Sequence, residues 1–145
     1  EVINADLNEL SLPLYSIDLE NENGIPENAH KFISLIKESD GIVLSIAEHN
    51  GLPTAAFKNI WDWTSRIEQK FWVNKPIFLA STSPGRRGGK SALESIEKIM
   101  PHFDGNIIST YSLPKFFDNL KDNNITNNDI NVVLNLKIST FSKSI

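Results

Sequence analysis

The sequence contains no cysteine, and this absence removes several classes of chemistry at once. Without thiols there is no disulfide framework, no thiolate metal site, no iron–sulfur ligation and no cysteine nucleophile. Neither His30 nor His102 has a partner at the spacing of metal ligands, so we expect both at the surface and predict no metal site. Any redox chemistry must therefore come from a bound cofactor.

Long apolar runs and an excess of positive charge are also missing. No run approaches the roughly 20 residues that cross a bilayer, and residues 1–6 do not resemble a signal peptide, so we expect a cytoplasmic protein without a membrane partner. The formal net charge is −4. This balance leaves no surplus of Lys and Arg for a phosphate backbone, which argues against nucleic acid as a partner.

What remains is the composition of one soluble globular domain, with 145 residues of which 40% are hydrophobic and 22% charged. Short aliphatic runs at residues 41–46, 77–81 and 106–110 predict strands, the first two buried on both faces. Residues 1–6 are expected to end a further strand, followed by an irregular segment and an acidic loop up to Gly24. We predict helices in four places, at about residues 26–38, 54–69, 90–103 and 128–141.

This alternation of strand, loop and helix predicts an α/β fold, with right-handed crossovers, a parallel sheet and helices on both faces. In such sheets ligands bind outside the carboxyl ends of the strands. Polar loops follow two of the predicted strands, at residues 47–51 and 82–89. Two adjacent loops of this kind could together bind one flat ligand.

Several stretches together resemble the NADPH-dependent FMN reductase family, which includes quinone and chromate reductases. Residues 12–15, Leu-Pro-Leu-Tyr, look like the segment that follows a strand in that family. Glu48-His49-Asn50 resembles its Pro-Glu-Tyr-Asn signature. Residues 57–66 resemble its Leu-Lys-Asn-Ala-Ile-Asp-Trp-Ser-Arg helix, and residues 81–89 resemble its third, glycine-rich loop. The order and spacing of these motifs carry the resemblance more than any one of them.

The resemblance implies a flavodoxin-like three-layer fold, with five parallel strands in the order 2-1-3-4-5 and FMN at the carboxyl edge of the sheet. It implies an enzyme in which NADPH or NADH, as co-substrate, gives hydride to the flavin, which then reduces a quinone, free flavin or other small acceptor. The cofactor carries this chemistry, so no catalytic side chain is predicted. Relatives of this kind are commonly homodimers or homotetramers, and the region of Trp61, Trp63, Phe71 and Trp72 is expected to supply an apolar patch.

The predicted flavin-binding residues lie in the two polar loops: Ala47, Glu48, His49, Asn50, Gly51, Ser81, Thr82, Ser83, Gly85, Gly88 and Gly89. Ala47 and His49 replace the usual proline and tyrosine of the family. Backbone amides and the Asn50 side chain are expected at the pyrimidine edge of the flavin, and His49 beside the ring. The glycines would let the main chain approach the ring closely.

Alternative interpretations remain for each of these features. The first loop could be a turn whose Asn and Gly only satisfy backbone geometry, and the second a flexible surface loop. Arg86 and Arg87 suit the 2′-phosphate of NADPH, but solvated arginines are as good an explanation. The helix at residues 57–66 is expected to have a structural or interface role rather than a catalytic one.

The sequence lacks the family's first strand and its Gly-Ser-x-Arg-x-x-Ser-x-Asn phosphate loop. We therefore expect residues 1–145 to be a single domain that is incomplete at its N-terminus, or to receive the missing part separately. A second possible function is that of an electron-transfer flavodoxin, or a flavin-binding protein without nicotinamide activity of its own. A third possibility is a relative that binds no flavin.

Overall fold

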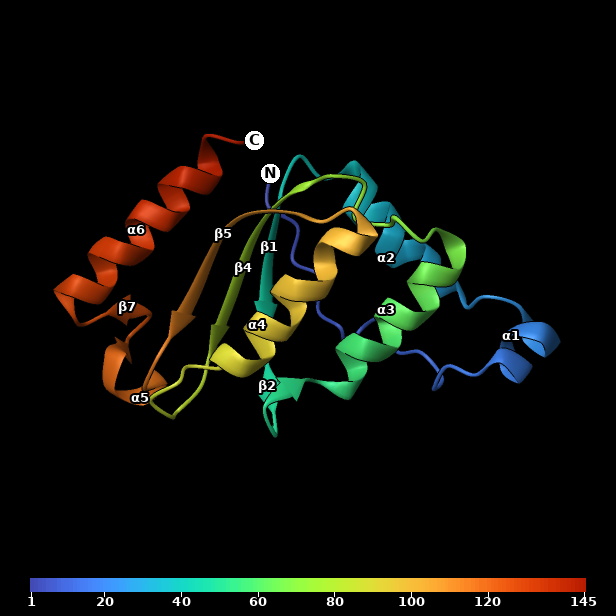
Figure 1. The fold of residues 1–145 in the computed structure, drawn as a ribbon, viewed down its shortest axis with the longest axis horizontal. Helices are drawn as coiled ribbons and strands as arrows, with labels where there is room; N and C mark the ends of the chain where they lie inside the picture. The colour runs from blue at the N-terminus through green and yellow to red at the C-terminus, as the bar shows by residue number, and fades with distance from the viewer.

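A computed structural model describes residues 1–145 and shows an α/β fold built on a parallel sheet of three strands (Figure 1). The strands are β1 (Ile42–Ile46), β4 (Pro76–Thr82) and β5 (Asn106–Leu113), and they lie in the order β1-β4-β5. Both neighbouring pairs are parallel. All three carboxyl ends therefore meet at one edge of the sheet, where β2 and α5 lie (Figure 1).

The remaining elements are helices and two small antiparallel hairpins. The hairpins are β2 (Glu48–His49) with β3 (Leu52–Pro53), and β6 (Leu120–Lys121) with β7 (Asn124–Ile125). The helices are α1 (Ile17–Asn23), α2 (Glu27–Glu38), α3 (Ala55–Ile67), α4 (Lys90–Ile99), the 3₁₀ helix η1 (Met100–Phe103), α5 (Phe116–Asn119) and α6 (Asn128–Ser142). No helix is long and apolar enough to cross a membrane.

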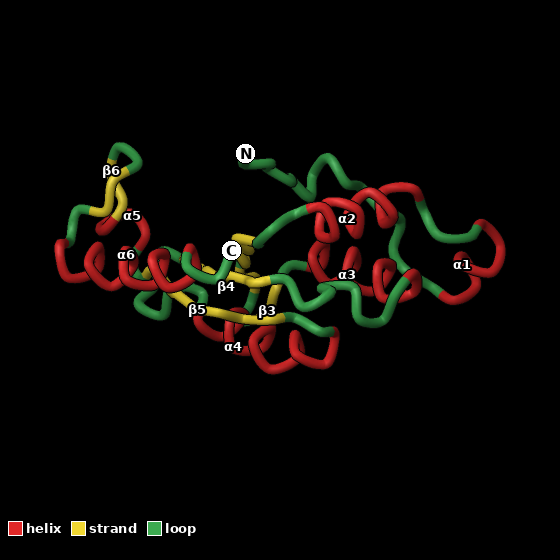
Figure 2. Tube along the Cα trace, turned by 90° about the horizontal axis from the view of Figure 1, so that it is seen from above, coloured by secondary structure: helices red, strands yellow, loops and turns green.

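Helices cover the two faces of the sheet unequally. On one face, α2, α3 and α4 join the inward side chains of β1 and β4 in the main hydrophobic core, which includes Ile46, Ile77 and Leu79. On the other face, α6 packs over β4 and β5, where the rings of Phe78 and Phe141 lie 6.1 Å apart. Seen from above, α4 lies to one side of the strands, and α1 lies at the end of the molecule farthest from the β6–β7 hairpin (Figure 2).

Most of the predicted elements are present with shifted ends. Thr54 caps α3 as predicted, because its side chain accepts a hydrogen bond from the Phe57 N–H. The strand predicted at residues 106–110 continues to Leu113. His30 and His102 are exposed, as predicted.

Two predictions at the N-terminal end are wrong. Residues 1–6 form no strand: no neighbouring strand pairs with them, and Val2 is 96% exposed. The predicted acidic loop contains α1, which begins where the Ser16 side chain accepts a hydrogen bond from the Leu19 N–H. The sheet of this chain thus has three strands, and not the five that the resemblance implied.

The strand β1 is buried on one face only, although the aliphatic run at residues 41–46 predicted burial on both faces. Ile42, Leu44 and Ile46 point toward the main core, while Val43 and Ser45 alternate with them toward solvent, and Val43 is 65% exposed. β1 is an edge strand of the sheet, and α6 packs over β4 and β5. One face of β1 therefore remains uncovered.

The aromatic side chains expected to form a surface patch lie instead in the core. Trp61, Trp63, Phe71 and Trp72 are each at most 3% exposed. The Trp61 ring meets Phe71, Trp72 and Phe103 edge-on, at centroid distances of 5.2, 5.6 and 5.0 Å. These four side chains are buried and expose almost no apolar surface, so the predicted aromatic patch is wrong.

Candidate functional site

The loop predicted after β1 is a tight hairpin at the carboxyl edge of the sheet. β2 and β3 pair Glu48 with Pro53 and His49 with Leu52, and Asn50 and Gly51 connect them with φ angles of 53° and 82°. Two successive positive φ angles are typical of a type I′ turn, for which Asn-Gly is the preferred pair. Backbone geometry thus accounts for Asn50 and Gly51, while Ala47, His49 and Asn50 remain exposed to solvent.

Glu48 connects this hairpin to the glycine-rich side of the site. Its Oε2 accepts a hydrogen bond from the backbone N–H of Ala92, 3.2 Å away, in the first turn of α4. A carboxylate is favourable there because the N-terminus of a helix carries free N–H groups and partial positive charge. A Cβ placed on Gly51 would lie 4.0 Å from the Cβ of Ser91. The hairpin therefore lies beside the start of α4, which directly follows the glycine-rich loop.

The glycine-rich loop is held by hydroxyl groups from the ends of β4 and β5. Ser81 Oγ and Ser112 Oγ both donate to the Gly88 carbonyl, at 2.8 and 2.9 Å. Thr82 Oγ1 donates to the Leu113 carbonyl at 2.8 Å, and the Phe116 N–H donates to the Ser83 carbonyl at 3.0 Å. The loop is thus ordered by contacts on both sides.

The three positions of this loop that are occupied by glycine differ in how much space surrounds the residue. A Cβ on Gly88 would come within 2.6 Å of the Leu113 backbone, and one on Gly89 within 3.0 Å of Ser81, and both residues have positive φ. Gly88 and Gly89 are therefore required by the packing of the loop itself, rather than by approach to a ligand. A Cβ on Gly85 would meet only Ser83 Oγ, at 3.7 Å. Gly85 alone has space that nothing in the chain fills.

Ser91 and Ser112 lie at this site although the sequence did not single them out. Ser91, whose side chain lies near Gly51, has a backbone N–H that makes no hydrogen bond within the chain. Ser112 was missed because the third strand was predicted to end at residue 110. The available signal for Ser91 was its position two residues after Gly88-Gly89, in the first turn of a predicted helix.

The motif at residues 57–66 has a structural role on the other side of α3. The Asn59 side chain accepts a hydrogen bond from the Tyr15 N–H at 2.8 Å and donates to the Pro13 carbonyl at 2.9 Å. Trp63 Nε1 donates to the same carbonyl at 2.8 Å. The segment before α1 is thereby fixed to α3. These contacts give the motif the structural role that was predicted for it.

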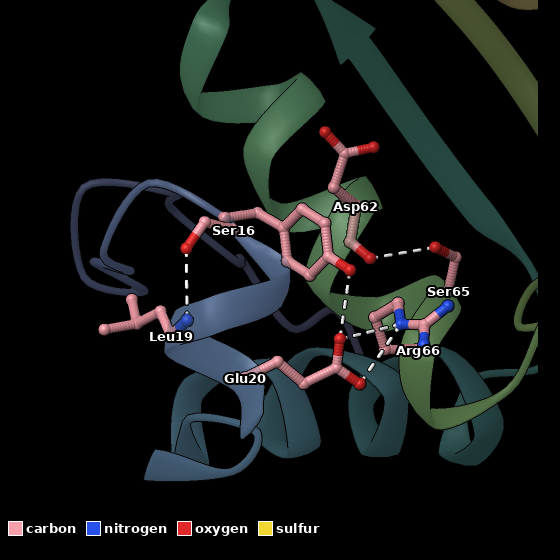
Figure 3. A network of polar contacts seen from close by, with 7 residues as sticks. Ser16, Leu19, Glu20, Asp62, Ser65 and Arg66 are labelled. Atoms are coloured by element: carbon pink, nitrogen blue, oxygen red, sulfur yellow. Dashed lines mark hydrogen bonds and ion pairs between the residues drawn. The ribbon is translucent and has the colours of Figure 1, made fainter. Parts of the chain in front are cut away.

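A second set of contacts continues this attachment. The Glu20 carboxylate accepts hydrogen bonds from Arg66 Nε at 2.9 Å and from the Tyr15 hydroxyl at 3.0 Å, and it points at Arg66 in Figure 3. The hydrogen bond to Glu20 raises the pKa of Arg66. Partial burial, and then the hydrogen bond to Glu20, raise the pKa of Tyr15. α1 is thus joined to the last turn of α3.

Comparison with known proteins gives a family for most of this chain. The profile of a family described as NADPH-dependent FMN reductase matches residues 1–118. A quinone reductase of Escherichia coli (strain K12) is 26% identical over 123 residues, which are 85% of this chain and 64% of that protein. An NADPH azoreductase of Bacillus sp. (strain OY1-2) is 32% identical over 103 residues, which are 71% of this chain and 55% of that protein.

A plant relative is similar over part of the chain, and a solved structure shares its fold. The NADPH:quinone oxidoreductase of Arabidopsis thaliana is 38% identical over 80 residues, which are 55% of this chain and 40% of that protein. The chain spans less than two thirds of the length of these curated relatives. FerB from Paracoccus denitrificans, a flavoenzyme NAD(P)H:(acceptor) oxidoreductase, has the same fold with a TM-score of 0.71 and 22% identity, covering 94% of this chain and 84% of its own.

Proposed function

The chain belongs to the NADPH-dependent FMN reductase family, and on that premise we propose that it is an oxidoreductase. It takes electrons from NADPH or NADH and passes them, through FMN at the carboxyl edge of the sheet, to a quinone, a free flavin or another small acceptor. The observation that supports this most is the hydrogen bond from the Ala92 N–H to Glu48, because it holds the first flavin-like loop against the first turn of α4, which directly follows the second. Separate surface loops would not form one binding edge.

The residues at this edge fit the ring portion of a flavin. Gly85 leaves open space in the glycine-rich loop, and the Ser91 N–H is a donor without a partner in the chain. The same residues offer no family-type phosphate loop, so they account for the ring and not for the phosphate tail. FMN bound there would supply the two-electron chemistry that a chain without cysteine lacks.

The chain's own residues have binding and positioning roles in this proposal. Backbone N–H groups of residues 47–51 and the Asn50 side chain donate hydrogen bonds toward the pyrimidine edge of the ring, and His49 borders the ring. The predicted residues of the second loop form the opposite wall: Ser81, Thr82, Ser83, Gly85, Gly88 and Gly89. No side chain needs to act as an acid or a base, because hydride transfer depends mainly on how donor and acceptor are stacked.

Flavin binding and reduction by nicotinamide nucleotides test the function directly. FMN is added to the purified chain, bound flavin is followed by its absorbance, and NADPH is then mixed in a stopped-flow instrument. Rapid bleaching of the bound flavin, and reoxidation by a quinone, are expected. Flavin that binds but is bleached only by a chemical reductant would favour the electron-transfer alternative, and no binding would contradict the proposal.

Gly85→Val separates the binding edge from the fold. The valine side chain fills space that the chain leaves open, so FMN binding should weaken at least about tenfold while thermal stability is unchanged. Ser34→Val on the exposed side of α2 is the matched control and should leave FMN binding as it is. Equal FMN affinity in both variants would place the flavin elsewhere.

We also propose that the chain works as a homodimer or homotetramer. With the aromatic residues buried, the apolar side chains left exposed are on other elements, among them Leu14 at 81%, Ile17 at 52% and Leu136 at 63%. Light scattering at micromolar concentration is expected to give a mass above the 16.3 kDa of one chain. A clean monomer would contradict this proposal.

A further inference from the structure

A groove of about 480 Å³ runs beside the glycine-rich loop, between α4 and β5. One end is lined by Arg86, Arg87 and Lys90, and no residue of the β2–β3 hairpin contributes to it. The groove therefore lies on the side of the glycine-rich loop away from the proposed flavin edge. A ligand here is a neighbour of the flavin and not the flavin ring itself.

Positive charge is concentrated at this end of the groove. Residues 83–90 carry three positive charges and no acidic residue, in a chain whose net charge is −4. Arg86 and Arg87 are exposed and take part in none of the ion pairs of the structure. Lys90 lies 3.7 Å from Glu94, an exposed pair one helical turn apart that contributes little. Two guanidinium groups are thus free to bind an anion.

The rest of the groove limits what kind of anion fits. Glu94, beside Lys90, and Glu97, about two turns of α4 further along, also line the groove and would repel a second anionic group. Leu93, Tyr111 and Pro114 add apolar and aromatic wall beside these charged residues. A suitable ligand therefore has one compact anionic group joined to an uncharged, flat portion, as a phosphorylated nucleoside does.

From this arrangement we infer that the groove binds the 2′-phosphoadenosine portion of NADPH, an inference that rests on the proposed function. Arg86 and Arg87 bind the 2′-phosphate, because a guanidinium group matches phosphate oxygens in charge and in geometry. Lys90 adds a third positive charge, and the base lies along Tyr111 and Pro114. The groove thereby makes the chain prefer NADPH to NADH.

Binding of a nucleotide fragment tests this inference without any flavin chemistry. Isothermal titration calorimetry of the full chain should show that adenosine 2′,5′-bisphosphate binds at least about tenfold more tightly than 5′-AMP, which lacks the 2′-phosphate. The variant with Arg86→Ala and Arg87→Ala together should lose this difference. Lys90→Ala should reduce it, and Lys98→Ala, an exposed lysine on the same helix outside the groove, should not.

Three results would overturn the inference. One is equal affinity of the unaltered chain for the two nucleotides, and another is a double-arginine variant that binds them as the unaltered chain does. The third concerns the source of the phosphate: displacement of the bisphosphate by inorganic phosphate at equal concentration would show an anion site without nucleotide specificity. Displacement by FMN but not by riboflavin would likewise assign the groove to the flavin phosphate.

Steady-state kinetics link the groove to the proposed function. In the double-arginine variant, KM for NADPH should rise about ten- to a hundredfold, while KM for NADH and kcat with NADH remain unchanged. If the bisphosphate binds as expected but no nucleotide reduces bound flavin, the proposed function fails and the nucleotide site stands. If NADPH and NADH reduce the bound flavin equally well, the proposed function stands and the inferred 2′-phosphate site fails.

Discussion

Among single residues, Asn59 fixes three backbone groups with one side chain. Its Oδ1 accepts from the Tyr15 N–H, and its Nδ2 donates to the carbonyls of Pro13 at 2.9 Å and Leu12 at 3.3 Å. These contacts join positions 44 to 47 residues apart in the sequence. A backbone segment with no regular structure of its own obtains its hydrogen bonds in this way.

Asn59→Ala should therefore destabilise the protein by about 1–3 kcal/mol, because partly buried backbone groups lose their partners. The control is Asn135→Ala on the exposed surface of α6, where the same substitution changes helix propensity equally but breaks only a contact with Asn131. Urea unfolding followed by circular dichroism gives both values. Similar losses in the two variants would mean that the attachment to α3 contributes little.

Within the glycine-rich loop, substitution of Gly88 by alanine should lower the free energy of unfolding the most. In Gly88→Ala the new Cβ would meet the Leu113 backbone at 2.6 Å, at a φ of +57°. We expect a loss of about 2–4 kcal/mol from the combined backbone strain and overpacking. Gly51→Ala has positive φ but no close contact, with Ser91 Cβ at 4.0 Å, so it should cost only about 1 kcal/mol. Equal losses measured by urea unfolding would argue against the steric explanation.

Among the elements, α4 depends on a residue that lies outside it. Glu48 on β2 accepts a hydrogen bond from the first turn of α4, whose preceding residue, Gly89, provides no side-chain cap. Glu48→Ala should lower the free energy of unfolding by about 1 kcal/mol, and Glu48→Gln by less, because glutamine keeps an acceptor but loses the charge. Glu97→Ala, exposed on α4 itself, is the control. Thermal unfolding in which Glu97→Ala costs as much as Glu48→Ala would contradict this role.

Element types were predictable where one local pattern decided them. The helices α2, α3 and α6 and the strands β1, β4 and β5 follow their hydrophobic patterns, and Thr54 marks the start of α3. α1 was missed because its residues include none that are buried, so no apolar stripe revealed it. Its signals were the Ser16 cap and the acidic residues of its first turn, and these are weaker than a stripe.

Burial was harder to predict than element type, because it depends on neighbours distant in the sequence. The run of aliphatic residues in β1 gave no indication that it lies at an edge with one face uncovered. The large aromatic residues after α3 could have faced a partner or the core, and only the fold shows that they are buried. At the candidate site, the sequence predicted the two loops, but the contact that holds the first loop against the start of α4, from Ala92 to Glu48, needed three-dimensional structure.

For the whole molecule, we expect stability to fall at alkaline pH as its two tyrosines lose their protons. Burial raises the pKa of Tyr111, and partial burial with the Glu20 hydrogen bond raises that of Tyr15, both from 10.0. The folded state then holds these protons more tightly than the unfolded chain does. Their contribution to stability is complete below pH 10.0 and is lost as the pH rises through the folded-state values.

Phenolate absorbance, recorded against pH, measures this directly. The native protein should titrate above 10.0 at both residues, and the protein in urea should titrate near the ordinary value. Tyr111→Phe should remove one of the two steps and weaken the decline in stability above that pH. A native titration that matches the one in urea would show that neither hydroxyl is protected.

The burial of the three tryptophans has a practical consequence for following the folding of this chain. Trp61, Trp63 and Trp72 all lie on the α3 side of the molecule, and α6 and the β6–β7 hairpin contain none. Intrinsic tryptophan fluorescence therefore reports on one half of the protein, whereas circular dichroism reports on every helix. Coincident transitions by the two methods would mean that the α6 layer unfolds together with the main core, and an earlier dichroism change would identify α6 as an independently unfolding layer.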